Sequence, residues 1–247
     1  MMRTVTCIAL FALVAPGGAA AQGWTWPERA ENLQVLPEDF GGDRLQGVMT
    51  GFTRALGVRC SHCLVGEEGR PLSEFDFPSD ENPNKETART MLRMLGDIDE
   101  ALKTVEPTGD RRVNMWCDTC HRGRPRPMTL QKELAEMDRA RGGEAALARY
   151  DSLRAELHGR GAYDFGEGSL NGLGYELLQA DRAGDAILVF ERNAKLFPAS
   201  GNAFDSLGEA WAAKGDTVRA IENYRRSLQL APRNRIAART LEELGAG

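Results

Sequence analysis

The sequence has no excess of positive charge and, beyond its first 21 residues, no long apolar run. Its formal net charge is −5, whereas a nucleic-acid-binding chain would carry a basic patch. No later apolar stretch is long enough to cross a bilayer, so we expect no integral membrane span and no nucleic-acid partner. The chain also lacks a Ser/His/Asp set, a pair of catalytic carboxylates and a phosphate-binding Gly loop. We therefore predict that it is not an enzyme.

The first 21 residues have the pattern of a secretory signal peptide. Arg3 gives a positive start, residues 4–15 are apolar, and residues 19–21 offer a small-residue cleavage site before Gln22. The alternative is an uncleaved N-terminal anchor, but the apolar run is too short to span a bilayer. We therefore expect cleavage after residue 21 and a periplasmic location for the mature chain.

Cysteine is scarce, and its placement is informative. Cys7 lies in the leader, and the other four form two pairs with two residues between them, Cys60/Cys63 and Cys117/Cys120. In an oxidising compartment vicinal thiols become disulfides unless other chemistry consumes them. Two such pairs and no further cysteine suggest a dedicated use.

The second pair belongs to the segment Cys-Asp-Thr-Cys-His at 117–121, a CxxCH motif. In this motif each thiol adds to one vinyl group of haem, and the two intervening residues place the sulfurs on adjacent pyrroles. The next side chain, His121, then reaches under the ring and becomes the proximal iron ligand. The motif therefore predicts one haem c, bound through Cys117, Cys120 and His121.

Other uses of the cysteine pairs stay open. A zinc site would need both pairs across a gap of 53 residues, wider than in short zinc modules, and gives no reason for His121. A thioredoxin-like pair would need a βαβ context, and no run of the sequence alternates like a strand for more than a few residues.

The first pair, Cys60/Cys63, is followed by Leu64 where the motif has histidine. His62 lies between the two cysteines, in a loop that thioether bonds would pin to the ring edge, so it is poorly placed to reach the iron. Two hypotheses follow. The site holds a second haem without a proximal His, or it is vestigial and the two cysteines form a disulfide.

A methionine-bearing helix pattern precedes each pair. Residues 44–56 and 85–102 carry apolar side chains at helical spacing, with Met49 and Met91 among them. A Met thioether opposite His stabilises reduced haem iron, although a Met on an apolar helix face more often belongs to the core. The repeated order of helix, turn and CxxC strengthens the case for a ligand role of both methionines, and the core alternative stays open.

The C-terminal part repeats with a period of 34 residues, and each matching residue pair has the same displacement. The pairs are Leu173-Gly174 with Leu207-Gly208, Ala186-Ile187 with Ala220-Ile221, Phe190 with Tyr224, and Pro198 with Pro232. Small residues that let two helices approach, an aromatic between units and a Pro at the next turn are typical of tetratricopeptide (TPR) repeats. Such arrays present a concave surface to a protein partner, which the sequence does not identify.

Residues 30–127 resemble the cytochrome c subunit of photosynthetic reaction centres, and more closely a two-haem half of it found in short bacterial relatives. The matching segments are Asn-Leu-Gln-Val-Leu at 32–36, Met49-Thr50, Leu-Gly-Val-Arg-Cys at 56–60, Ala-Arg-Thr-Met-Leu-Arg-Met at 88–94, and 117–123 with Pro125 and Pro127. The resemblance implies that Met91 pairs with His121, with Met94 as runner-up, and that Met49 belongs to the Cys60/Cys63 site. The family subunit holds four haems, whereas this chain has cysteines for at most two. Leu64 also replaces the family's His, so we favour one haem.

Three arginines follow the CxxCH motif, Arg122, Arg124 and Arg126. They either pair with haem propionates, for which the guanidinium fork is suited, or form a solvated basic loop. The sequence favours neither alternative.

Together these patterns predict an all-α protein: a small multihaem-type cytochrome c module followed by TPR-like helical hairpins. The expected parts are a signal peptide (1–21), a cytochrome domain (22–130), a helical linker (131–165) and a TPR-like domain (166–247). The expected function is single-electron transfer with redox partner proteins that the sequence does not name. The alternatives are a TPR scaffold with a degenerate cytochrome domain, and a haem-based sensor with an open coordination position.

Overall fold

The computed structural model describes residues 24–105 and 114–246, which form helices joined by loops. They form ten α-helices and two short 3₁₀ helices, with no strand beyond one isolated bridge between Val65 and Asp76. The predicted all-α class is confirmed. In the part of the chain that is described, no helix is both long and apolar enough to span a membrane. The predicted signal peptide, 1–21, lies outside the described residues.

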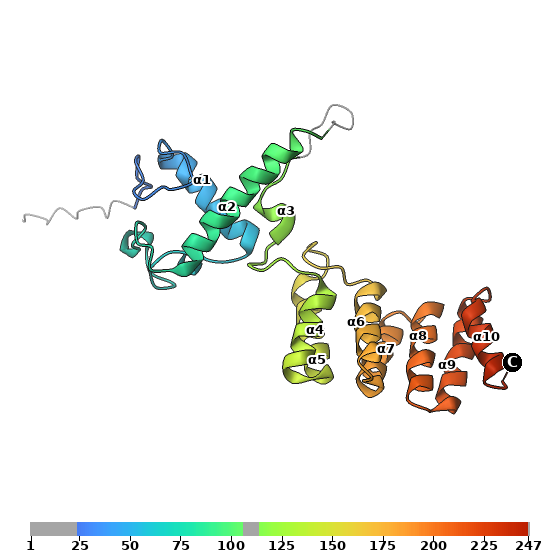
Figure 1. The fold of residues 1–247 in the computed structure, drawn as a ribbon. Coiled ribbons are helices and arrows are strands. Elements are labelled where there is room, and N and C mark those ends of the chain that lie inside the picture. The colour runs from blue at the N-terminus through green and yellow to red at the C-terminus, as the bar shows by residue number, and fades with distance from the viewer. Residues whose placement is uncertain (1–23, 106–113, 247) are drawn as a thin grey trace, which may run out of the picture. The chain divides into compact units, whose positions relative to one another are not determined.

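The described residues divide into two compact units, whose helices are labelled in Figure 1. The first unit comprises residues 24–50 and 59–94, and the second comprises 51–58, 95–105 and 114–246. Helices α1 (Gly42–Leu56) and α2 (Pro83–Leu102) each contribute residues to both units.

The first unit is organised around a buried arginine on α2. Arg89 is only 7% exposed, and its Nη2 donates to the Asp80 carboxylate at 2.8 Å and to the Asn32 carbonyl at 3.4 Å. Its other terminal nitrogen donates to Glu86 at 3.1 Å. These contacts join the start of the described chain, the loop before α2 and α2 itself. The connection between α1 and α2 also contains two 3₁₀ helices, η1 (Cys60–His62) and η2 (Leu72–Glu74).

Buried side chains are few in the N-terminal half of the chain. Within the described part of 24–128, the buried residues are Leu45, Ala55, Leu64, Arg89 and His121. The large apolar cluster of the described chain is formed by residues from Leu130 onward. The apolar core therefore lies in the C-terminal helices.

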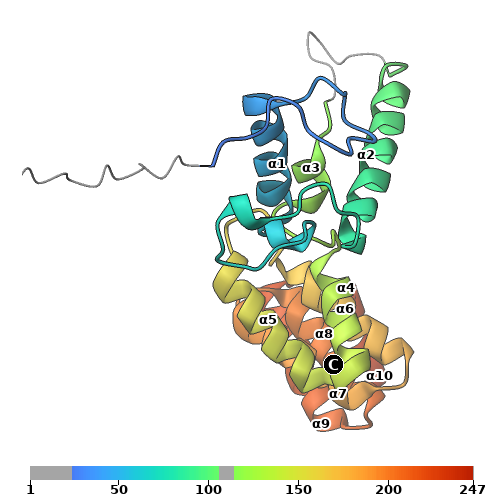
Figure 2. The same cartoon turned by 90° about the vertical axis from the view of Figure 1, so that its left-hand side faces the viewer.

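The C-terminal helices form antiparallel pairs that stack side by side (Figures 1 and 2). The pairs are α4 (Leu130–Arg141) with α5 (Gly143–Leu157), α6 (Glu167–Gln179) with α7 (Ala183–Leu196), and α8 (Gly201–Ala213) with α9 (Thr217–Leu230), followed by α10 (Arg235–Glu243). We call residues 130–246 the helix array. In it α6 contacts both α4 and α8, and α10 packs on α9.

The residues of the 34-residue repeat occupy equivalent buried places. Leu173, Ala186 and Phe190 are 1%, 0% and 0% exposed, and their partners Leu207, Ala220 and Tyr224 are 6%, 0% and 4% exposed. A Cβ atom at Gly174 would overlap the Phe190 ring, so glycine allows the close approach of α6 and α7. The predicted TPR-like helix pairs are confirmed.

The segment expected as a helical linker, 131–165, contains a further helix pair. Helix α4 contacts α6 and α5 contacts α7, so this pair stacks on the next one. Three of its fully buried residues, Leu134, Ala146 and Tyr150, lie 40 residues before Gly174, Ala186 and Phe190. The displacement exceeds 34 because the α5–α6 connection (158–166) is longer than the α7–α8 connection (197–200).

Candidate functional site

Helix α3 (Cys117–His121) is a single turn formed by the CxxCH motif. At its start, the Thr119 side chain accepts a hydrogen bond from the Trp116 amide at 3.1 Å. It ends at Arg122 and Gly123, both in the left-handed region with φ of 49° and 77°, which terminates a helix. Residues three and four apart share a helix face, so Cys117, Cys120 and His121 lie on one side of the turn.

Both ends of α3 are fixed to the last turn of α1, within the second unit. The Gly123 amide donates to the Ala55 carbonyl at 2.8 Å, and the Trp116 ring stacks on Phe52 with centroids 6.1 Å apart. Gly57, with φ of +66°, approaches Gly123 so closely that a Cβ atom would overlap its carbonyl oxygen. The segment before the first cysteine pair therefore supports the second motif.

The His121 ring is buried and oriented by the backbone. It is 8% exposed, and its Nδ1 lies 2.8 Å from the Arg124 carbonyl oxygen. A carbonyl oxygen can only accept, so Nδ1 carries the proton in this pair. In the neutral ring Nε2 then keeps its lone pair, which is the arrangement of a metal-ligating histidine.

Arg124 connects this backbone contact to the helix array. Its guanidinium lies 4.0 Å from the centre of the Tyr163 ring, and its Nη1 donates to the Met128 carbonyl at 2.5 Å. Its Nε is buried and finds no hydrogen-bond partner among the described residues. Tyr163 belongs to the long α5–α6 connection and is not predicted by any sequence motif. The 40-residue displacement of the first helix pair is the signal that marks this connection as unusual.

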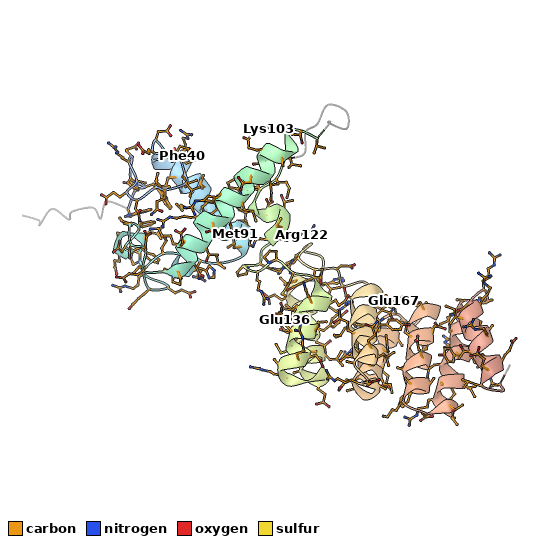
Figure 3. The ribbon with its side chains drawn as sticks, viewed as in Figure 1. Phe40, Met91, Lys103, Arg122, Glu136 and Glu167 are labelled. Atoms are coloured by element: carbon orange, nitrogen blue, oxygen red, sulfur yellow. The ribbon has the colours of Figure 1, made fainter. Side chains whose placement is uncertain are left out.

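The other two arginines after the motif differ from Arg124. Arg126 forms a two-pronged ion pair with Glu136 of α4, at 2.8 and 3.0 Å, and this guanidinium lowers the pKa of Glu136. Arg122, directly after α3, is exposed. Figure 3 labels both Arg122 and Glu136. Of the three, Arg126 is thus already engaged by a carboxylate.

The two cysteines of the CxxCH motif differ in exposure. Cys117 is half-buried and Cys120 is exposed, and burial raises the pKa of the Cys117 thiol. None of the four described cysteines forms a disulfide. Within residues 24–105 and 114–246, no group of three or more His, Cys, Asp or Glu side chains gathers as a metal site requires.

The first cysteine pair lies in η1 and the residue that follows it. The amides of Cys63 and Leu64 both donate to the Cys60 carbonyl, at 3.2 and 3.0 Å. Leu64 is 8% exposed, in the motif position that His121 occupies in the second pair. The first site therefore places a buried aliphatic side chain where an imidazole would be needed.

The predicted methionine ligands lie on the two expected helices. Met49 on α1 and Met91 on α2 are half-buried, and Figure 3 labels Met91. The runner-up Met94 is 45% exposed. Met91 belongs to the first unit and His121 to the second, so the axial pairing of these two residues stays a prediction, as does the role of Met49.

Comparison with known proteins finds no matching family model and no matching curated protein. Among solved structures, the N-terminal domain of stress-induced protein-1 (STI-1) from C. elegans is similar. It is 17% identical, with 47% of this chain and 91% of that chain covered and a TM-score of 0.34. Similarity at this level identifies neither a ligand nor a partner.

Proposed function

We propose that this chain is a periplasmic c-type cytochrome that carries single electrons, with a helix array that binds a protein partner. The observation that carries the proposal is the 2.8 Å hydrogen bond between His121 Nδ1 and the Arg124 carbonyl. It fixes a buried ring with Nε2 available to a metal, directly after two cysteines on the same turn. The residues present therefore fit a covalently attached haem.

The sparse core of the N-terminal half supports the same proposal. Protein interiors are close-packed, and a domain ordinarily has one contiguous apolar core. In the described part of 24–128 the buried apolar side chains are only Leu45, Ala55 and Leu64. A haem attached at Cys117 and Cys120 would supply the large apolar surface that these helices otherwise lack.

Each residue has a distinct role in this proposal. Bound haem supplies a one-electron couple at its iron. Cys117 and Cys120 would hold the group through thioether bonds, and His121 Nε2 would ligate the metal. The Arg124 carbonyl keeps the His121 ring in one tautomer and one orientation. Met91 is proposed as a second residue that would ligate the iron.

The helix array is proposed as the part that selects a partner. Stacked helix pairs of this kind present an extended surface, and the array has its own large core. A redox protein docked there would be held by the same chain as the haem-bearing module. The chemistry of that partner is left open.

The proposal is tested by expressing the full chain with a periplasmic haem-attachment system and staining a denaturing gel for haem. We expect a haem-positive band that disappears in the Cys117→Ser/Cys120→Ser variant. The Cys60→Ser/Cys63→Ser variant is the matched control and should keep the stain.

Two other outcomes would change the conclusion. A colourless wild-type protein would favour the scaffold alternative, in which only the helix array has a function. A coloured protein whose reduced form binds carbon monoxide would show an open coordination position and favour the haem-based sensor.

A further inference from the structure

We propose that Cys60 and Cys63 carry no haem and instead form a reversible dithiol–disulfide pair. This site does not depend on a haem at His121. It shares with the proposed function only the oxidising compartment in which the chain would work.

The residues of the first pair do not fit a haem held like that of the second. Leu64 occupies the ligand position, and an aliphatic side chain offers the iron no lone pair. His62 lies inside the turn, and its carbonyl accepts hydrogen bonds from the side-chain amides of Asn82 and Asn84, at 3.2 and 2.9 Å. The backbone between the cysteines is thus fixed by the protein's own side chains.

The same turn suits a disulfide. In a 3₁₀ helix the side chains at positions i and i+3 eclipse each other, and the Cys63 amide closes such a turn on the Cys60 carbonyl at 3.2 Å. Burial is the main cause that raises the pKa of the Cys63 thiol, and the nearby Cys60 thiol raises this pKa further. A ring closed by so few residues forms at little cost in chain entropy. Both cysteines are only half-buried, so an external thiol can reach the sulfurs and reduce the disulfide again.

The reaction is thiol–disulfide exchange with an external small-molecule disulfide, RSSR. The thiolate of one cysteine attacks RSSR, forming a mixed disulfide and releasing one RS⁻, which takes up the proton that the cysteine lost. The second cysteine, as thiolate, then displaces the other RS⁻, which also takes up a proton. In total two protein thiols and RSSR give Cys60–S–S–Cys63 and two RSH, so the pair loses two electrons and RSSR gains them.

The experiment uses the full chain matured with the haem-attachment system. One sample is reduced with dithiothreitol and another is incubated with oxidised glutathione. Both are then alkylated with N-ethylmaleimide, and intact mass and peptide mapping count the adducts. We expect one haem per chain, two maleimides on the 60/63 peptide after reduction and none after oxidation. The Leu64→His variant completes the motif, so it should gain a second haem and lose both maleimide adducts.

Several outcomes would overturn this inference. They are two haems on the wild-type chain, maleimide labelling of Cys60 and Cys63 that oxidised glutathione does not change, and a stable mixed disulfide with glutathione. A chain with no haem but with reversible labelling at 60/63 would contradict the proposed function and still support the dithiol pair. The two failures are therefore distinguishable.

Discussion

Gly57 shows how a single residue supports the candidate haem site. It ends α1 with φ of +66° and lies against the Gly123 carbonyl, whose own amide bonds to Ala55. A side chain here meets both an unfavourable backbone region and a steric overlap.

We expect Gly57→Ala to lower the free energy of unfolding by about 1–3 kcal/mol. Gly47→Ala, on the exposed part of the same helix, is the control. No atom outside its own helix lies within 4 Å of the added Cβ in the described structure, and Ala is the better helix former by about 1 kcal/mol. Urea unfolding followed by tryptophan fluorescence measures both. Equal effects of the two substitutions would contradict the steric argument.

The buried Arg89 makes the stability of the first unit depend on acid. Its hydrogen bond is the largest cause that holds the pKa of Asp80 well below its usual range, with Asn32 and Lys85 adding to it. A carboxyl whose folded-state pKa is depressed stabilises the fold above its unfolded pKa, about 3.9. That stabilisation is lost as pH falls below this value toward the folded pKa.

Arg89→Met should therefore flatten the loss of stability that sets in as pH falls below about 4. Arg93→Met is the control, because Arg93 is 50% exposed and pairs with Glu86. Thermal unfolding midpoints at several pH values provide the measurement. An unchanged pH profile in Arg89→Met would rule out this pair as the source of the acid dependence.

The sequence predicted the residues of the candidate site better than it predicted their supports. A CxxCH motif specifies two thiols and an imidazole by residue type, so Cys117, Cys120 and His121 can be found without a structure. The Arg124 carbonyl that orients His121 is a backbone atom, and any residue at 124 would supply one. Leu64 could be recognised as a departure, but not as a buried one.

At the scale of helices, close packing in the array depends on two glycines that differ in the space available for an added Cβ atom. A Cβ at Gly174 would overlap the Phe190 ring, whereas at Gly208 it would lie 3.1 Å from the nearest Tyr224 atom. Both substitutions gain helix propensity of about 1 kcal/mol. The steric cost should differ.

We expect Gly174→Ala to destabilise the array by about 1–3 kcal/mol through overpacking, and Gly208→Ala to be within about 1 kcal/mol of wild type. Chemical unfolding followed by far-UV circular dichroism, which reports mostly on the array, compares the two. If Gly208→Ala were the more harmful, the inferred difference in packing would be wrong.

The long α5–α6 connection gives a second prediction at this scale. Tyr163 covers the guanidinium of Arg124, and such a cation–π contact is worth about 1 kcal/mol. Tyr163→Leu removes the ring face, so the 121–124 turn should loosen. If His121 ligates haem iron as proposed, that bond should then exchange more readily. Tyr163→Phe keeps the aromatic ring and should behave like the wild type.

Haem midpoint potential and binding of added imidazole measure this effect. A change that appears in Tyr163→Leu and is absent from Tyr163→Phe supports the role of the ring. If both variants behaved like wild type, Tyr163 would have no influence on the haem ligand.

The same connection explains why the sequence revealed two helix pairs and not the third. Residues 173–232 match at a displacement of 34, whereas α4 and α5 match the next pair at 40. Leu134 also stands where the later pairs have glycine, so the small-residue signal is absent. Helical periodicity was visible in 131–165, but its place in the stack depends on tertiary contacts.

At the scale of the whole molecule, the two halves should differ in their need for haem. The helix array has its own apolar core, whereas the described part of 24–128 buries few apolar side chains. Without covalent haem, we expect limited proteolysis of the Cys117→Ser/Cys120→Ser variant to degrade residues 24–128 and leave a fragment beginning near Leu130.

Mass spectrometry of the fragments identifies what survives, and the wild type matured with the haem-attachment system is the control. Digestion of both halves at one rate would contradict this difference. The same would hold if 24–128 in the variant resisted protease as well as in wild type.

A division of the chain into consecutive sequence segments misses one association. Helical periodicity predicted the all-α class, and the CxxC motifs and the 34-residue repeat distinguished the N-terminal from the C-terminal part. The sequence gives no sign that residues 51–58 associate with 116–123, because Gly57 and Gly123 are 66 positions apart and meet through backbone atoms. That association joins the second motif to a segment that would otherwise be assigned to the first.

Stacking of like units also affects how this protein could change its length. Each helix pair contacts its immediate neighbours, and the α7–α8 junction at Pro198 recurs at Pro232. Duplication of one 34-residue segment at that junction would add a pair whose two faces already match those beside it. Gene duplication could thus enlarge the proposed docking surface in whole steps and leave the turn around His121 unchanged.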